Sequence, residues 1–176
     1  MRNEVIASLF VIAVLAGAGV GYLLGYNNHQ TVNSTMVSFS YSPRGQVKVD
    51  KVGATMTPAK NGLENVTFWV TFENTGSAPV YAIGGWVGAL SASISGNSTV
   101  IQAASSRLCP GAIYLVTLNQ GQNATVYAPD CASGFNYQLV HTGNVAMVLS
   151  FDWTTNRQET TPFSNSTTIQ ANFVFS

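Results

Sequence analysis

The apolar positions divide the chain into two parts with different periodicity. Val5–Tyr26 is an uninterrupted apolar run without a charged side chain. From residue 36 onward, apolar and polar residues alternate over short segments that are separated by turn residues. The first pattern is typical of a membrane-spanning helix and the second of half-buried β-strands. We therefore predict a membrane anchor helix at 1–26, a polar linker at 27–35 and a β-sandwich domain at 36–176.

The apolar run is long enough to cross a bilayer. At a rise of ~1.5 Å per residue, about 22 residues match a hydrocarbon core of ~30 Å. Arg2 precedes the run and the next basic residue is Arg44, so the N-terminus is expected in the cytoplasm and the C-terminal domain outside the cell. A signal peptide cleaved near Ala16-Gly17-Ala18 is the alternative, although the run continues beyond a usual signal core.

Three glycines repeat every four residues inside the apolar run. Gly17, Gly21 and Gly25 fall on one face of the expected helix. Small residues at this spacing let a second helix approach closely. The apolar run predicts contact with membrane lipid. The glycine pattern predicts a further membrane or surface protein subunit as a partner, in a homo- or hetero-oligomer.

The period-two alternation predicts about nine strands and, beyond the anchor, no amphipathic helix. The clearest strand is Asn65–Glu73, in which Val and Phe alternate with Thr and Trp. The expected fold is all-β, an antiparallel immunoglobulin-like β-sandwich of about 7–9 strands preceded by one transmembrane helix. The expected strands are Met36–Tyr41, Gln46–Lys51, Asn65–Glu73, Val80–Leu90, Ala112–Leu118, Asn123–Ala128, Phe135–Val140, Val145–Trp153 and Thr167–Phe175.

One expected strand, Val80–Leu90, is unusually rich in glycine. Glycine inside a strand indicates a bulge or a close approach of another backbone. We therefore predict a partner surface here, formed by Gly84, Gly85, Trp86 and Gly88.

The surface of the domain must be polar without being charged. Charged residues make up 8% of the chain and the formal net charge is zero, which argues against a nucleic-acid partner. The polar groups come mainly from Asn, Ser, Thr and Gln, and they include five N-x-[ST] acceptor sequences. These predict N-glycosylation at Asn33, Asn65, Asn97, Asn123 and Asn165.

The chain has two cysteines, Cys109 and Cys131, both in the part expected outside the cell. In an oxidising compartment the simplest interpretation is a disulfide, which closes a loop of about 20 residues and stabilises the fold by about 3 kcal/mol. A redox-active or metal-binding pair is the alternative, although no CxxC spacing is present.

Residues for catalysis or metal binding are sparse. His141 is the one histidine of the expected outer domain, and the acidic residues are scattered. Cys131, His141 and Met147 follow the order of copper ligands, but the second histidine would have to be His29 in the linker. No nucleophile elbow or phosphate-binding loop is present. We therefore predict no catalytic, cofactor-binding or metal-binding residues, and no enzyme activity of the chain on its own.

The segment FWVTFENTGSAPVYAIGG, together with the N-terminal span, resembles the anchored, glycosylated surface domains of archaea. Related layouts occur in archaellum stators, pilin-like subunits and strand-exchanging thread filaments. This resemblance implies an immunoglobulin-like sandwich with a structural role. A second resemblance, through GGWVGAL at Gly84–Leu90, is to the small subunit of archaeal thiosulfate:quinone oxidoreductase.

Three functional hypotheses follow. The first is a non-catalytic structural or assembly subunit of a surface or membrane complex. The second is the small extracytoplasmic subunit of a membrane oxidoreductase, packed against a larger subunit through the helix glycines. The third is a pilin-like filament subunit whose short leader is removed near Asn3.

Overall fold

A computed structural model describes residues 36–43, 45–59, 62–85, 89–96, 99–103, 113–128, 137–160 and 162–176. By its internal contacts the chain divides into two compact units, Met1–Thr31 and Val32–Ser176. The first unit, which contains the predicted anchor, lies outside the described residues. The described part of the second unit is built from β-strands and contains no helix.

The described residues form eleven strands. Alternating apolar side chains explain the longer ones, because each buries one face and exposes the other. The strands are β1 (Met36–Tyr41), β2 (Val47–Pro58), β3 (Glu64–Asn74), β4 (Val80–Gly85), β5 (Ser91–Ile94), β6 (Ile101–Ala103), β7 (Ile113–Leu118), β8 (Asn123–Ala128), β9 (Tyr137–Leu139), β10 (Gly143–Thr154) and β11 (Asn165–Phe175).

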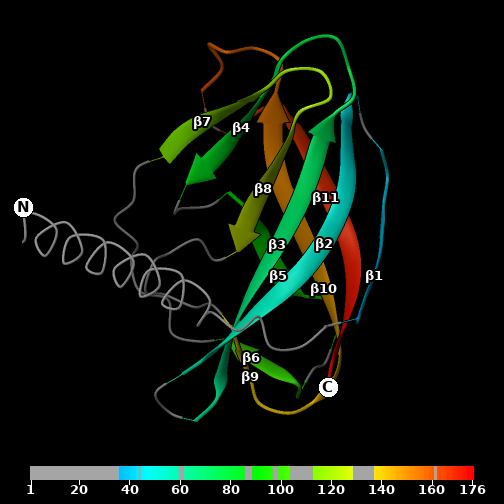
Figure 1. Cartoon of the computed structure of the whole chain (residues 1–176), viewed down its shortest axis with the longest axis vertical. Helices are drawn as coiled ribbons and strands as arrows, with labels where there is room; N and C mark the ends of the chain where they lie inside the picture. Colours follow the sequence, from blue (N-terminus) through cyan, green and yellow to red (C-terminus); the bar gives the residue numbers. More distant parts are fainter. Residues whose placement is uncertain are drawn as a thin grey trace, which may run out of the picture. The chain divides into compact units, whose positions relative to one another are not determined.

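The strands form two antiparallel sheets. Sheet A has the order β1-β11-β10-β4-β7, and β5 also pairs with β10. Sheet B has the order β2-β3-β9-β6, and β8 also pairs with β3. In Figure 1, β3, β2 and β8 lie in front of β10 and β11. The chain passes between the sheets several times, since β1, β4, β7 and β10 belong to sheet A and β2, β6 and β8 to sheet B.

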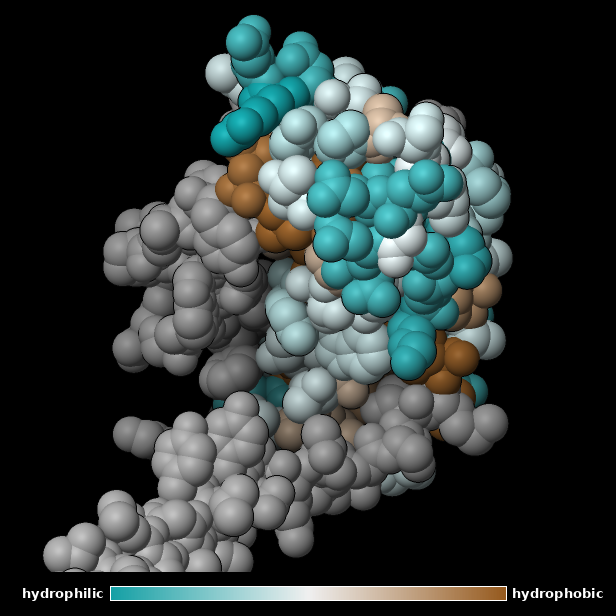
Figure 2. Space-filling view, turned by 45° about the horizontal axis from the view of Figure 1, so that its top comes forward, coloured by the Kyte–Doolittle hydropathy of each residue, from teal (hydrophilic) through white to brown (hydrophobic). Residues whose placement is uncertain are grey.

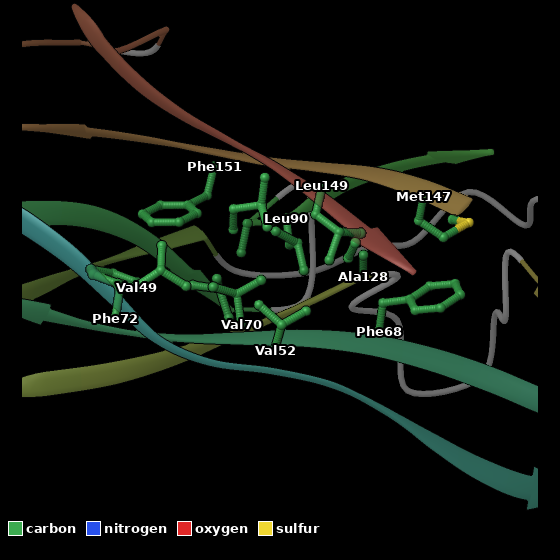
Figure 3. Packing of buried hydrophobic residues seen from close by; sticks show 14 of the residues in the cluster. Val49, Val52, Phe68, Val70, Phe72, Leu90, Ala128, Met147, Leu149 and Phe151 are labelled. Carbon is green, nitrogen blue, oxygen red and sulfur yellow. The ribbon is translucent and has the colours of Figure 1, made fainter. Parts of the chain in front are cut away.

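The core lies between the two sheets. Phe72 of β3 stacks on Phe151 of β10, with ring centroids 4.4 Å apart, and Phe68 meets Phe173 of β11 edge to face at 4.8 Å. Figure 3 shows the labelled side chains of both sheets pointing toward one another. These contacts bury large aromatic areas, which dominate the stabilisation of such a fold. The sheets therefore pack face to face as a sandwich-like pair.

A bulge in β2 changes which residues face the core. The pairing of β2 with β3 shifts between Val49 and Lys51. As a result Val47 and Val49 are buried before the bulge, and Val52 is buried after it, although the simple alternation would have turned Val52 outward. An extra residue of this kind bends a strand and increases its twist.

For the described residues the predicted all-β architecture with antiparallel sheets is confirmed. The strands Met36–Tyr41 and Asn123–Ala128 have the predicted bounds. The number of strands is higher than the predicted seven to nine, because β5 and β6 form in a serine-rich stretch that carries little apolar alternation. Both are short strands, and each forms by pairing with a neighbour: β5 with β10, and β6 with β9. This pairing is not visible in the sequence pattern.

Candidate functional site

The outer face of sheet B presents ordered rows of side chains. Three outward residues of β3, Thr71, Trp69 and Glu73, lie opposite outward residues of β8 in register. Trp69 pairs with Tyr127, and Thr71 pairs with Thr125. Residues directly opposite each other in an antiparallel pair have Cβ atoms about 5 Å apart, so their side chains interact. The face is therefore an ordered array of aromatic and hydroxyl groups, with Glu73 and Asn123 at one end.

The indole of Trp69 lies flat on the backbone of β2. Its register partner there is Gly53. A Cβ added at Gly53 would meet three adjacent ring atoms, Cζ2, Cε2 and Cη2, at 2.1, 2.4 and 2.7 Å. Distances this similar to adjacent atoms mean that the face of the ring, and not its edge, covers the glycine. Glycine is required at this position because any side chain would displace the indole.

A shallow groove of about 380 Å³ runs beside this indole. We call it the Trp69 groove; it is lined by Lys51, Thr55, Trp69, Thr71, Thr125 and Tyr127. Tyr127 is 44% exposed, and the hydroxyls of Thr71 and Thr125 are hydrogen-bonded at 2.8 Å. In Figure 2 teal and pale residues cover most of the visible surface, with brown residues gathered at its margins.

The electrostatics of the groove are simple. Among the described residues of its lining, Lys51 is the one cation and none is a carboxylate. The neighbouring Lys48 is engaged elsewhere, since its ammonium lies 2.8 Å from Asp50 and 3.8 Å from Glu73. Hydrogen bonding to Asp50 raises the pKa of Lys48, so this cation stays charged. The groove therefore suits a ligand that offers hydroxyl groups and an apolar face and carries no positive charge.

A second shallow groove, of about 460 Å³, lies along β1 and β11. Its lining consists of hydroxyl, phenol and amide groups: Ser40, Tyr41, Ser42, Ser166, Thr168 and Gln170. Ser40 and Gln170 are register partners, as the outward alternation of both strands requires. None of its described lining residues has an aromatic ring lying against a described glycine, so it offers less for a ligand to stack on.

The structure describes three of the predicted glycosylation sites, and they differ in exposure. Asn123 is exposed at the start of β8, and Asn165 is half-buried at the start of β11. Asn65 is only 8% exposed, and its Oδ1 accepts a hydrogen bond from Nε2 of Gln138 at 3.0 Å. A sugar on Asn65 would have to displace this packing, so Asn65 is the least accessible of the three.

Several predicted sites lie outside the described residues. Gly84 and Gly85 are described, and they end β4 opposite Tyr114 and Ile113 of β7. The remaining residues of the predicted partner surface, the helix glycines, both cysteines and two acceptor asparagines are not described: Trp86, Gly88, Gly17, Gly21, Gly25, Cys109, Cys131, Asn33 and Asn97. The pairing of the cysteines and the packing of the helix therefore stay predictions.

Among the described residues no three His, Cys, Asp or Glu side chains group closely enough to hold a metal ion. His141 is exposed after β9. Met147 lies in the core with no exposed surface. The described part of the chain also contains no helix with the length and hydrophobicity needed to cross a bilayer.

The sequence pattern did not reveal the Trp69 groove. The alternation of β3 correctly turned Trp69 outward, and Tyr127 is the outward aromatic of β8. The remaining signal is Gly53, a glycine in the interior of a strand. These residues come together only through the register of β2, β3 and β8, and this register cannot be deduced from a single sequence.

Comparisons of the chain with models of protein families, with curated proteins and with solved structures found no match.

Proposed function

We propose that this protein is a membrane-anchored, N-glycosylated β-sandwich outside the cell, which serves as a non-catalytic assembly subunit of an archaeal surface or membrane complex. In this proposal residues 1–26 are the anchor, with the N-terminus in the cytoplasm. The sandwich is assigned to the immunoglobulin-like type, supported by two facing antiparallel sheets and by repeated crossing of the chain between them.

The observation that carries the proposal is that both end strands of sheet A expose a large apolar side chain. β1 and β7 are the terminal strands of its described order, and each has six residues. Each also exposes a large apolar side chain, Phe39 at 37% and Leu115 at 48%. A terminal strand presents backbone N–H and C=O groups that can pair with another strand.

The two strands support a head-to-tail assembly. If β1 of one copy pairs with β7 of the next, sheet A continues from copy to copy. Because the two edges differ, such contacts are heterologous and generate an open chain of subunits unless the rotation closes it. The pairing would bury Phe39 and Leu115 and satisfy edge backbone groups, which is the mode of β-strand addition. β1 directly follows the predicted linker, which would keep the growing sheet near the membrane.

Self-association of the full chain tests the proposal. The protein is solubilised in a mild detergent, and its mass distribution is measured by native mass spectrometry and negative-stain electron microscopy. We expect concentration-dependent oligomers that shorten in F39K and in L115K, because a lysine charge at an edge opposes pairing. V174K is the matched control: Val174 is 38% exposed, but it lies on β11, between β1 and β10.

Three results would contradict the proposal. Wild-type protein that stays monomeric at all concentrations would contradict edge pairing. Stoichiometric recovery with a polytopic membrane subunit would favour the alternative, an accessory subunit of a membrane oxidoreductase. An equal effect of V174K would show that the outer face, and not the edges, carries the contact.

A further inference from the structure

Asn123 and the Trp69 groove lie on the same face of the same strand. In β8 the outward positions alternate as Asn123, Thr125 and Tyr127, and their burial follows this alternation. Asn123 is paired in register with Glu73, two rows from the pair of Tyr127 and Trp69. Four residues along a strand correspond to about 13 Å. A group attached to the side chain of Asn123 therefore leaves the protein at one end of the groove.

The floor of the groove is suited to a sugar ring. One face of the Trp69 indole is occupied by Gly53, so the ring is held against the sheet. An aromatic face carries partial negative charge, and the C–H groups along one face of a pyranose carry partial positive charge, so the two surfaces attract while both lose contact with water. Tyr127, in register with Trp69, extends the aromatic surface.

The rim of the groove supplies the polar partners. The bonded hydroxyls of Thr71 and Thr125 each retain acceptor capacity, because a hydroxyl has one donor and two acceptor positions. Lys51 of β2 is the register partner of Thr71, and it adds an ammonium donor on the side of Thr71 that lies away from β8. Hydroxyl groups of a saccharide both donate and accept, so they match this mixture. A neutral or acidic sugar is favoured, since Lys51 is cationic and none of the described lining residues is a carboxylate.

We propose that the Trp69 groove holds the oligosaccharide attached to Asn123 of the same chain. The inference rests on the N-glycosylation that forms part of the proposed function. A tethered glycan is present at high effective concentration, so even weak stacking on Trp69 fills the groove. A few sugar units are sufficient to reach from Asn123 to the indole. The glycan then covers an aromatic patch that would otherwise face water.

The test uses the full, glycosylated chain in mild detergent. Glycopeptide mass spectrometry first establishes whether Asn123 is modified. N-bromosuccinimide then oxidises accessible indoles, and peptide mapping locates Trp69 separately from the other tryptophans. We expect Trp69 to be oxidised several-fold more slowly in wild-type protein than in N123Q. N165Q is the matched control, since it removes an acceptor site on sheet A and should leave the oxidation of Trp69 unchanged.

The outcomes separate the two proposals. An unmodified Asn123 overturns both the glycosylation of this site and the inference that depends on it. A modified Asn123 with equal oxidation of Trp69 in wild-type protein and N123Q overturns the inference alone. Slower oxidation in the wild type, with N165Q unchanged, supports it. N123Q alters an exposed side chain, so the comparison does not depend on a variant that fails to fold.

Discussion

Asn74 is the residue whose replacement most directly tests how the sandwich is held together at one end. It is the last residue of β3, and its side chain has no exposed surface. Its Nδ2 donates hydrogen bonds to the carbonyl oxygens of Ala78 at 2.8 Å and Leu118 at 2.9 Å. Its Oδ1 accepts a hydrogen bond from the N–H of Gly76 at 3.0 Å. One amide thus joins the β3–β4 turn of the chain to the end of β7.

The expected cost of replacing Asn74 by alanine follows from these bonds. A hydrogen bond contributes about 1 kcal/mol net, and a buried group left without its partner costs about 1–3 kcal/mol. The bond to Leu118 is fully buried and the other two are partly buried. Three lost bonds therefore predict a loss of about 3 kcal/mol, against a total stability of about 5–15 kcal/mol for a typical domain.

Thermal unfolding of the full chain, followed by near-ultraviolet circular dichroism in mild detergent, measures this loss. At about 2–4 °C per kcal/mol for a chain of this size, N74A is expected to unfold about 6–12 °C below the wild type. N172A is the control, because Asn172 is an exposed residue of β11. It makes the same chemical change and should shift the midpoint by less than about 2 °C.

N74D sharpens the test, because aspartate keeps the size of the side chain. A carboxylate has no N–H to donate to the carbonyl oxygens of Ala78 and Leu118, and it places a charge in a buried site. N74D is therefore expected to be at least as unstable as N74A. A loss below about 1 kcal/mol in N74A, or a tolerated N74D, would refute the argument that this amide connects the β3–β4 turn to the end of β7.

Two further predictions concern single hydrogen bonds. The hydroxyl of Tyr41 accepts a hydrogen bond from the N–H of Val49 at 3.1 Å, and Y41F removes this acceptor. We therefore expect Y41F to lower the free energy of unfolding by about 1 kcal/mol, as measured by thermal unfolding. An equal loss in Y81F would contradict this cause. For Glu159, the hydrogen bond from Thr154 lowers the pKa below its ordinary value of 4.5. A lowered folded-state pKa stabilises the protein above the unfolded value, and the benefit is lost as pH falls through the folded-state pKa. The difference in thermal unfolding midpoint between the wild type and E159Q should therefore be largest above pH 4.5 and vanish in stronger acid. A difference that persists in stronger acid would show that the stabilisation has another cause.

The strands that the sequence predicts best are those whose pattern is local. In β3, Phe68 and Phe72 face the core while Trp69 and Thr71 face outward, and this alternation is visible in the sequence without any knowledge of the neighbours. The same holds for β10 and β11. Period-two patterning works here because each of these strands has one buried and one solvent-facing side.

The prediction was incomplete for β2, and the bulge explains why. The alternation through Val47 and Val49 ends at Lys51, where the predicted strand also ended. In the structure the pairing shifts at this point, and the strand continues to Pro58 with Val52 and Met56 buried. A bulge changes the parity of the pattern, so a search for unbroken alternation stops at the bulge even though the strand continues.

The candidate site depends on information that the pattern does not hold. Taken alone, Gly53 is a glycine that weakens a strand because it has no side chain to pack, and Trp69 is an outward aromatic side chain. Their register brings the ring onto the glycine, and the same register places Tyr127 on the other side of Trp69. The contact that compensates for the missing side chain of Gly53 also holds the indole flat. The stability of the β2–β3 pair and the aromatic face offered to a ligand therefore come from one arrangement, and a substitution at Gly53 would disturb both.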